Sequence, residues 1–134
     1  PIAFVQTDDL LAVPGCTQQV LNAIRDFVVF LPAATPVNAN TATPEVLSAR
    51  LPGLSLADAN ALAASRKQAS FRDLADLAGR LPGKPVSVDP SLFSVASNYF
   101  LVTGRITIRA ATLQVNALVE RLGAATHLLW TREV

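Results

Sequence analysis

Residues 38–53 read NANTATPEVLSARLPG, and this stretch contains the start and the end of a short helix. Thr43 is a preferred N-cap residue, and Pro44 suits the first helical position. The negative charge of Glu45 interacts favourably with the positive end of the helix dipole. The Pro52–Gly53 pair ends the helix, because proline lacks an N–H group and glycine tolerates a left-handed turn. We therefore predict a short helix that closes on a tight corner.

The segment that follows this corner has the composition of a second, longer helix. Residues 56–66 are rich in alanine and leucine, which have high helix propensity. Four of their apolar side chains fall on one face at helical spacing: Leu56, Ala59, Leu62 and Ala63. Residues 70–77 indicate a third, capped helix with a buried stripe of Phe71, Leu74 and Leu77. Each helix is short, so its stability must come from packing.

Two further stretches carry the same corner of an apolar residue, proline and glycine. Val13 precedes the Pro14–Gly15 pair, and residues 71–83 repeat the order of residues 4–15. We expect Pro14–Gly15 and Pro52–Gly53 to be the turns of helical hairpins, too irregularly spaced for a solenoid. Residues 31–36 contain two prolines and indicate a connector.

From about residue 86 the apolar period changes from that of a helix to that of a strand. Residues 99–109 alternate, with four apolar side chains on one face: Phe100, Val102, Ile106 and Ile108. Residues 112–121 alternate in the same way. Residues 126–134 indicate a last strand, in which Leu128 and Trp130 would share a face. With a turn at Gly123, these strands predict an antiparallel meander.

The predicted fold class is therefore α+β, with helix-hairpin-helix (SAM-like) units first and a three-stranded antiparallel meander last. We expect the helical part to occupy residues 1–85 and the strands to occupy residues 86–134. Of the two parts, we expect the helical one to be autonomous and the meander to be less stable.

The composition excludes several function classes. Eleven Lys and Arg against ten Asp and Glu give a net charge of +1, which provides no broad field for nucleic acid or anionic lipid. No apolar run approaches the ~20 residues that span a bilayer. The single Cys16, expected to be buried, excludes an internal disulfide and a cysteine metal cluster. The chain has no methionine and begins at Pro1, so we expect a processed or excised fragment.

Catalytic, cofactor-binding and metal-binding residues are not assigned, because the motifs for such sites fail. His127 is the only histidine, and no carboxylate stands at a useful spacing along its strand. Residues 79–85 are one residue short of a phosphate-binding loop, and Pro85 replaces the hydroxyl residue that binds magnesium.

The corner at residues 51–55 supports an alternative function, a helix-hairpin-helix DNA-binding module. It resembles the motif of DNA-repair proteins and competence DNA receptors, in which backbone N–H groups at a helix start approach a phosphate. Here Ser55 stands where a second glycine is expected, and Asp58 places a negative charge in the first helical turn. The start of this helix is therefore poorly suited to bind an anion.

One resemblance covers essentially the whole chain. The residues Asn38, Asn40, Thr41, Ala42 and Leu47 resemble the Asn-x-Asn-Thr-Ala-x-x-x-x-Leu signature of the type II secretion minor pseudopilin K family, general secretion pathway protein K. The flanking order matches as well, at Phe4, Gly15, Leu31-Pro32, Arg66, Phe71, Ser97–Phe100, Leu118 and Arg121.

The resemblance implies that the chain is the C-terminal part of a larger protein. Residues 1–85 would be the later part of a helical domain inserted into a pilin-like domain, and residues 86–134 would be the C-terminal strands of that pseudopilin domain. It also implies a periplasmic location and an inner-membrane anchor, through an N-terminal hydrophobic helix absent from this fragment.

The function that the resemblance implies is structural, without enzymatic activity or nucleic acid. Together with the minor pseudopilins I and J, the family caps the pseudopilus tip, which assists export of folded proteins through the outer-membrane secretin. The secretin and the cargo are further partners that it implies. Calcium is associated with the family, but no acidic cluster in this sequence places a calcium site.

Overall fold

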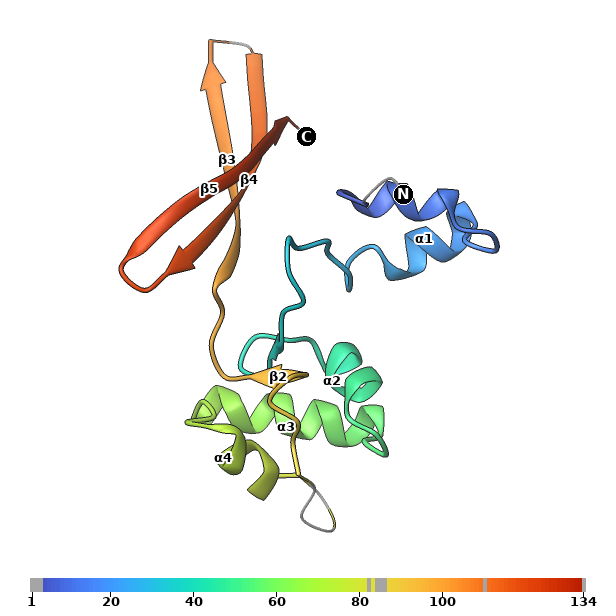
Figure 1. Cartoon of the computed structure of the whole chain (residues 1–134), viewed down its shortest axis with the longest axis vertical. Helices are drawn as coiled ribbons and strands as arrows, with labels where there is room; N and C mark the ends of the chain where they lie inside the picture. The colour runs from blue at the N-terminus through green and yellow to red at the C-terminus, as the bar shows by residue number, and fades with distance from the viewer. Residues whose placement is uncertain (1–3, 82, 84–86, 110, 134) are drawn as a thin grey trace. The chain divides into compact units, whose positions relative to one another are not determined.

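The structure is a computed structural model that describes residues 4–81, 83, 87–109 and 111–133. The chain divides into two compact units, Pro1–Val95 and Ala96–Val134. Helices occupy the first unit, and a three-stranded antiparallel sheet forms the second (Figure 1), so the predicted α+β class is confirmed. The expected boundary falls on Pro85 and Val86, which lie outside the described residues.

The described residues of the first unit form a 3₁₀ helix and four α-helices. In chain order they are η1 (Thr7–Ala12), α1 (Gln18–Ile24), α2 (Pro44–Arg50), α3 (Leu56–Gln68) and α4 (Leu74–Gly79). None of the helices within the described residues is both long and apolar enough to cross a membrane.

Side-chain caps fix where the helices begin. Thr43 accepts the N–H of Val46 at 3.4 Å at the start of α2, as the sequence predicted. Helix α4 begins later than predicted, at Leu74, because Asp73 accepts the N–H of Asp76 at 2.7 Å and so supplies the cap. Phe71 therefore precedes the helix, although its side chain is buried as expected.

One hydrophobic core holds α2, α3, α4 and the segment after them together. Its buried members are Ala39, Leu47, Leu51, Ala59, Leu62, Phe71, Leu77, Val88 and Phe93. Leu56 was expected on this face but is 50% exposed, because it occupies the first position of α3, ahead of the core. Val88 and Phe93 show that the residues leading toward the sheet still pack with the helices.

Two very short strands, which the sequence analysis did not predict, close this unit. Strand β1 (Val37–Asn38) pairs in parallel with strand β2 (Phe93–Ser94). Val37 donates its N–H to the carbonyl of Leu92, and Ala39 donates to Ser94, each at 2.8 Å. This pairing explains why the first unit extends to Val95.

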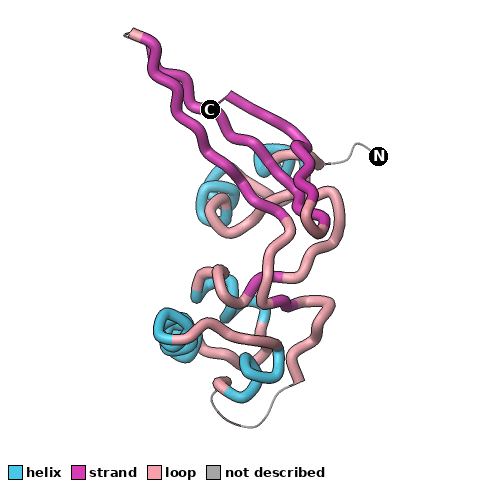
Figure 2. The backbone as a smooth tube through the Cα atoms, turned by 90° about the vertical axis from the view of Figure 1, so that its left-hand side faces the viewer, coloured by secondary structure: helices cyan, strands magenta, loops and turns pink. Residues whose placement is uncertain are grey.

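The second unit is the predicted meander of β3 (Tyr99–Ile108), β4 (Ala111–Leu122) and β5 (Ala125–Glu133), hydrogen-bonded in that order. Strands β3 and β4 run side by side along their length (Figure 2). Residues directly opposite one another in antiparallel strands share a face. The face that carries Phe100 and Val102 on β3 therefore carries Val119 and Ala117 on β4, as the alternation predicted.

The expected sharing of a face by Leu128 and Trp130 is wrong. Trp130 pairs with Leu118, whereas Leu128 pairs with Val119, so a β-bulge leaves Leu129 as the extra residue. Because the bulge adds one residue to the alternation, it turns Trp130 to the face opposite Leu128.

Candidate functional site

The signature segment forms a tight turn directly after β1. The side-chain oxygen of Asn38 accepts the N–H of Asn40 at 2.9 Å, and its main-chain carbonyl accepts the N–H of Ala42 at 2.9 Å. Thr41 donates its own N–H to the same carbonyl at 3.1 Å. Asparagine suits this position because its short amide can bond the backbone two residues on. The turn delivers the chain to the N-cap of α2.

Asn40 joins three segments that are distant in sequence. Its amide nitrogen donates to the carbonyls of Phe71 at 2.9 Å and Val95 at 3.1 Å, and its amide oxygen accepts the N–H of Phe71 at 2.8 Å. An amide is the side chain that can both donate and accept in this way. The half-buried side chain of Asn40 thus connects the residues just before α4 with Val95, the last residue of the first unit.

The neighbouring signature residues complete the same interior. Ala39, which separates the two asparagines, is buried, and its carbonyl accepts the guanidinium of Arg66 at 2.6 Å. Desolvation by burial lowers the pKa of Arg66 from its ordinary value. Leu47 is fully buried in the core, and Ala42 packs against it. The signature residues are therefore brought together, as structural elements of the fold.

The predicted hairpin turns occupy two exposed corners. Gly15 has φ +90 between η1 and α1, and Gly53 has φ +79 between α2 and α3. Both glycines adopt the left-handed backbone that disfavours other residues. Pro14 and Pro52 are exposed beside them. At the second corner Ser48 donates its hydroxyl to the carbonyl of Leu54 at 2.9 Å.

The start of α3 carries the negative charge that the sequence analysis expected. The hydroxyl of Ser55 accepts the N–H of Asp58 at 3.1 Å and donates to the Asp58 carboxylate at 2.7 Å. A carboxylate therefore stands in the first turn, where a phosphate would have to approach the N–H groups of the helix. This arrangement disfavours the DNA-binding alternative.

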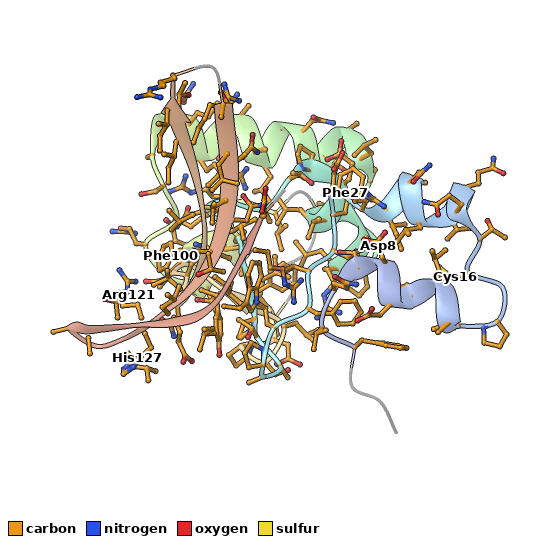
Figure 3. The ribbon with its side chains drawn as sticks, turned by 90° about the horizontal axis from the view of Figure 1, so that it is seen from above. Asp8, Cys16, Phe27, Phe100, Arg121 and His127 are labelled. Atoms are coloured by element: carbon orange, nitrogen blue, oxygen red, sulfur yellow. The ribbon has the colours of Figure 1, made fainter. Side chains whose placement is uncertain are left out.

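One face of the sheet carries a row of apolar side chains, most of them exposed. On it lie Phe100, Val102, Ile106, Ile108, Leu113, Val115, Val119 and Leu128. Near one end, the Arg121 guanidinium carbon lies 5.3 Å from the centroid of the Phe100 ring, and Figure 3 shows both side chains on neighbouring strands. Such a patch is typical of an interaction surface.

The opposite face carries a polar row that the sequence analysis missed. Tyr99 donates its hydroxyl to Glu120 at 2.8 Å, and Glu120 stands opposite His127 on β5. This hydrogen bond raises the pKa of Tyr99 from its ordinary value. The spacing along the His127 strand gave no sign of a carboxylate, because Glu120 lies on the neighbouring strand. Only the register of the sheet could have found it.

Metal and thiol chemistry find little support in the described part of the chain. No group of three or more His, Cys, Asp or Glu gathers there as ligands for a metal ion. The described residues therefore assign no site to the calcium that the family resemblance implies. Cys16 is a free thiol and half-buried, not fully buried as expected.

Comparison with known proteins gives two similarities. Residues 37–96 match the model of the family "Type II secretion system (T2SS), protein K". These residues include the whole Asn38–Leu47 segment, and the match confirms the resemblance that the signature indicated. No curated protein sequence matches the chain.

The second similarity is to a solved structure. A chain in the crystal structure of the GspK-GspI-GspJ complex from the enterotoxigenic Escherichia coli type 2 secretion system shares the fold, with a TM-score of 0.68 and 21% sequence identity. The superposition covers 98% of the present chain, which spans 48% of the E. coli chain.

Proposed function

We propose that the protein is a structural minor pseudopilin of the type II secretion system protein K family, whose model residues 37–96 match. The observation that carries the proposal is the match of these residues, whose signature contributes the Asn40 hydrogen bonds and the buried Leu47 to the helical unit. The likeness in fold along 98% of the chain supports it.

The partners we propose are the minor pseudopilins I and J. The E. coli structure is a complex of GspK with GspI and GspJ, and a chain in it has this fold. The exposed apolar face of the sheet is the kind of surface that assembly buries. In this proposal the three proteins cap the periplasmic pseudopilus tip and assist export of folded proteins through the secretin.

Within this proposal, residues 1–85 are the later part of an inserted helical domain and the sheet belongs to the pseudopilin domain. A bulky inserted helical domain leaves no room for another subunit above it in the filament, so the protein would end the filament and present this domain to cargo or secretin. The protein acts in the periplasm, with its anchor in the inner membrane. The role we propose is mechanical and assigns no catalytic residue; calcium stays implied by the family resemblance, without an assigned site.

The test of this function is co-expression with the I and J proteins of the same secretion system. We expect the chain to co-purify with them, whereas failure to do so by a folded chain would contradict the assignment of partners. In cells, deletion of the gene should abolish secretion or deregulate pseudopilus length. Normal secretion together with normal length would overturn the tip role.

A DNA-binding measurement distinguishes the pseudopilin role from the alternative, a helix-hairpin-helix DNA-binding module. The net charge of +1 and the Asp58 carboxylate predict no DNA binding with a salt slope of several charges. Salt-dependent binding that is lost when the Gly53 corner is altered would instead support the DNA-binding module.

A further inference from the structure

The chain enters and leaves the helical region of residues 37–95 through two strands that pair with each other. Strand β1 begins this region and strand β2 lies at its end, and Figure 2 shows them as two short segments side by side. The strands are parallel, so the chain enters at one end of the pair and leaves at the other. A pull on both ends of this region therefore draws the two strands past each other along their length.

Main-chain hydrogen bonds cross from the entering segment to the leaving segment. Val37 donates its N–H to the carbonyl of Leu92, and Ala39 donates its N–H to the carbonyl of Ser94, each at 2.8 Å. Sliding moves every donor away from its acceptor at the same time, so these bonds resist it together. A pull that acts on the two strands from the same end would instead break the bonds one after another.

The side chain of Asn40 adds a further bond of this kind. Its amide nitrogen donates to the carbonyl of Val95 at 3.1 Å, one residue after β2. The same amide exchanges two hydrogen bonds with the backbone of Phe71, at 2.9 Å and 2.8 Å, and the Phe71 side chain is buried. Asn40 therefore cannot follow a pulled Val95 without breaking its bonds to Phe71.

Both strands are also anchored in the interior of the helical region. On the entering side, the carbonyl of the buried Ala39 accepts the guanidinium of Arg66, from α3, at 2.6 Å. On the leaving side, Phe93 of β2 is buried in the hydrophobic core. Sliding of the strands would break the hydrogen bonds and expose Phe93 in the same step, and both changes cost free energy.

We propose that the pairing of β1 with β2, together with the Asn40 side chain, is a mechanical clamp that keeps the helical region folded when its two chain ends are pulled apart. Its resistance depends on the direction of the pull, because only sliding loads the hydrogen bonds together. The inference goes beyond the proposed function, because it concerns the response of one unit to force and holds whichever partners the protein binds.

Optical tweezers test the clamp on the whole chain, with the direction of the pull set by two attached handles. The handles are linked to engineered cysteines in a Cys16→Ser background, which leaves no other thiol. Ala34→Cys with Ala96→Cys makes the strands slide, whereas Ala34→Cys with Ser91→Cys pulls both strands from the same end. The three attachment sites are exposed. Circular dichroism verifies that each protein is folded.

The rate of unfolding at a fixed force is compared between the two pulls. It should be about tenfold lower in the sliding pull, because several hydrogen bonds must break in one step. This comparison leaves every residue of the clamp unchanged. Equal rates in the two pulls, or faster unfolding in the sliding pull, would overturn the proposal.

A substitution tests the part that Asn40 plays. Asn40→Ala should raise the unfolding rate in the sliding pull about tenfold, because the bond to Val95 is then missing from the loaded set. In the other pull the bonds of Asn40 are the last to be loaded, so the rate should rise much less. Equal increases in the two pulls are the mark of a general loss of stability, and they would contradict a role of Asn40 in the clamp.

Two further variants complete this test. Asn60→Ala, at an exposed amide that bonds only its own helix, should change neither rate by more than about twofold. Asn40→Asp replaces Asn40→Ala if the latter does not fold, since it keeps the acceptor for the N–H of Phe71 and loses the donor to Val95. It should likewise speed unfolding mainly in the sliding pull, and equal increases in the two pulls would again count against the clamp.

Discussion

The helical region of residues 37–95 and the β3–β5 sheet use apolar residues in opposite ways. The helical region places nine described residues in one buried core. In the sheet, the buried residue is Leu118, at 2% exposure, and most of the large apolar side chains remain exposed. The comparison teaches that one part of the chain buries a core of its own, whereas the other leaves most of its large apolar side chains exposed within the described residues.

Their hydrogen bonds differ in the same sense. Asn40 links residues 31 and 55 positions away in sequence, at Phe71 and Val95. The sheet relies on neighbouring strands joined by short turns. Hydrogen bonds thus connect distant segments of the helical region, whereas in the sheet they connect strands that follow one another in the sequence.

The largest expected effect is the loss of stability when one buried leucine is truncated in each region. Leu47→Ala should destabilise the helical region by about 4 kcal/mol, because a fully buried site leaves a cavity. Leu118→Ala should cost the sheet about 2 kcal/mol, because few other apolar side chains of the sheet are buried with it. Chemical denaturation followed by residue-resolved NMR measures both. Equal losses in both regions would break the comparison.

The next effect tests the long-range link. Asn40→Ala leaves two carbonyls and one N–H of the helical region without their partner, so we expect a loss of about 3 kcal/mol. Asn60→Ala is the matched control, because Asn60 is exposed on α3 and bonds only Leu56 of its own helix. It should change stability by less than about 0.5 kcal/mol. Equal effects of the two variants would refute the role assigned to Asn40.

The smallest effects concern pH and differ in sign between the regions. The hydrogen bond from Arg80 lowers the pKa of Asp76 below its ordinary 3.8, and the N–H of Arg72 adds to this. Its contribution is complete above pH 3.8 and is lost as pH falls through the folded pKa. The pKa of Tyr99 is raised above 10.0, so its contribution is complete below pH 10.0 and is lost as pH rises.

Matched variants check these signs. Asp76→Asn should reduce the acid sensitivity of the helical region and leave the alkaline response of the sheet unchanged. Tyr99→Phe should do the reverse. Circular dichroism and NMR across both pH ranges measure the responses, and acid sensitivity unaltered by Asp76→Asn would exclude that carboxylate as its source.

Local sequence signals predicted the helices and strands well. Thr43 and Pro44 marked the start of α2, since a cap needs only neighbouring residues. The alternation of residues 99–109 gave the two faces of β3, because a strand places successive side chains on opposite sides.

The features that sequence reasoning missed depend on contacts between distant segments. Strands β1 and β2 are two residues each and pair across more than fifty positions, so no local period shows them. The bulge at Leu129 shifts one register and reverses the face of Trp130. The signature asparagines were recognised as a pattern, but their role appeared only when Phe71 and Val95 were placed beside Asn40.

Native-state hydrogen exchange of the unmodified chain tests the central claim most directly. The measurement compares the exchange rates of buried backbone amides in α2 and α3 with those of the hydrogen-bonded backbone amides in β4. If the helical region completes its own interior and the sheet does not, the helical amides should be the better protected, with opening free energies near that of global unfolding. Strand amides that are better protected than those of the helices in residues 43–77 would contradict the account.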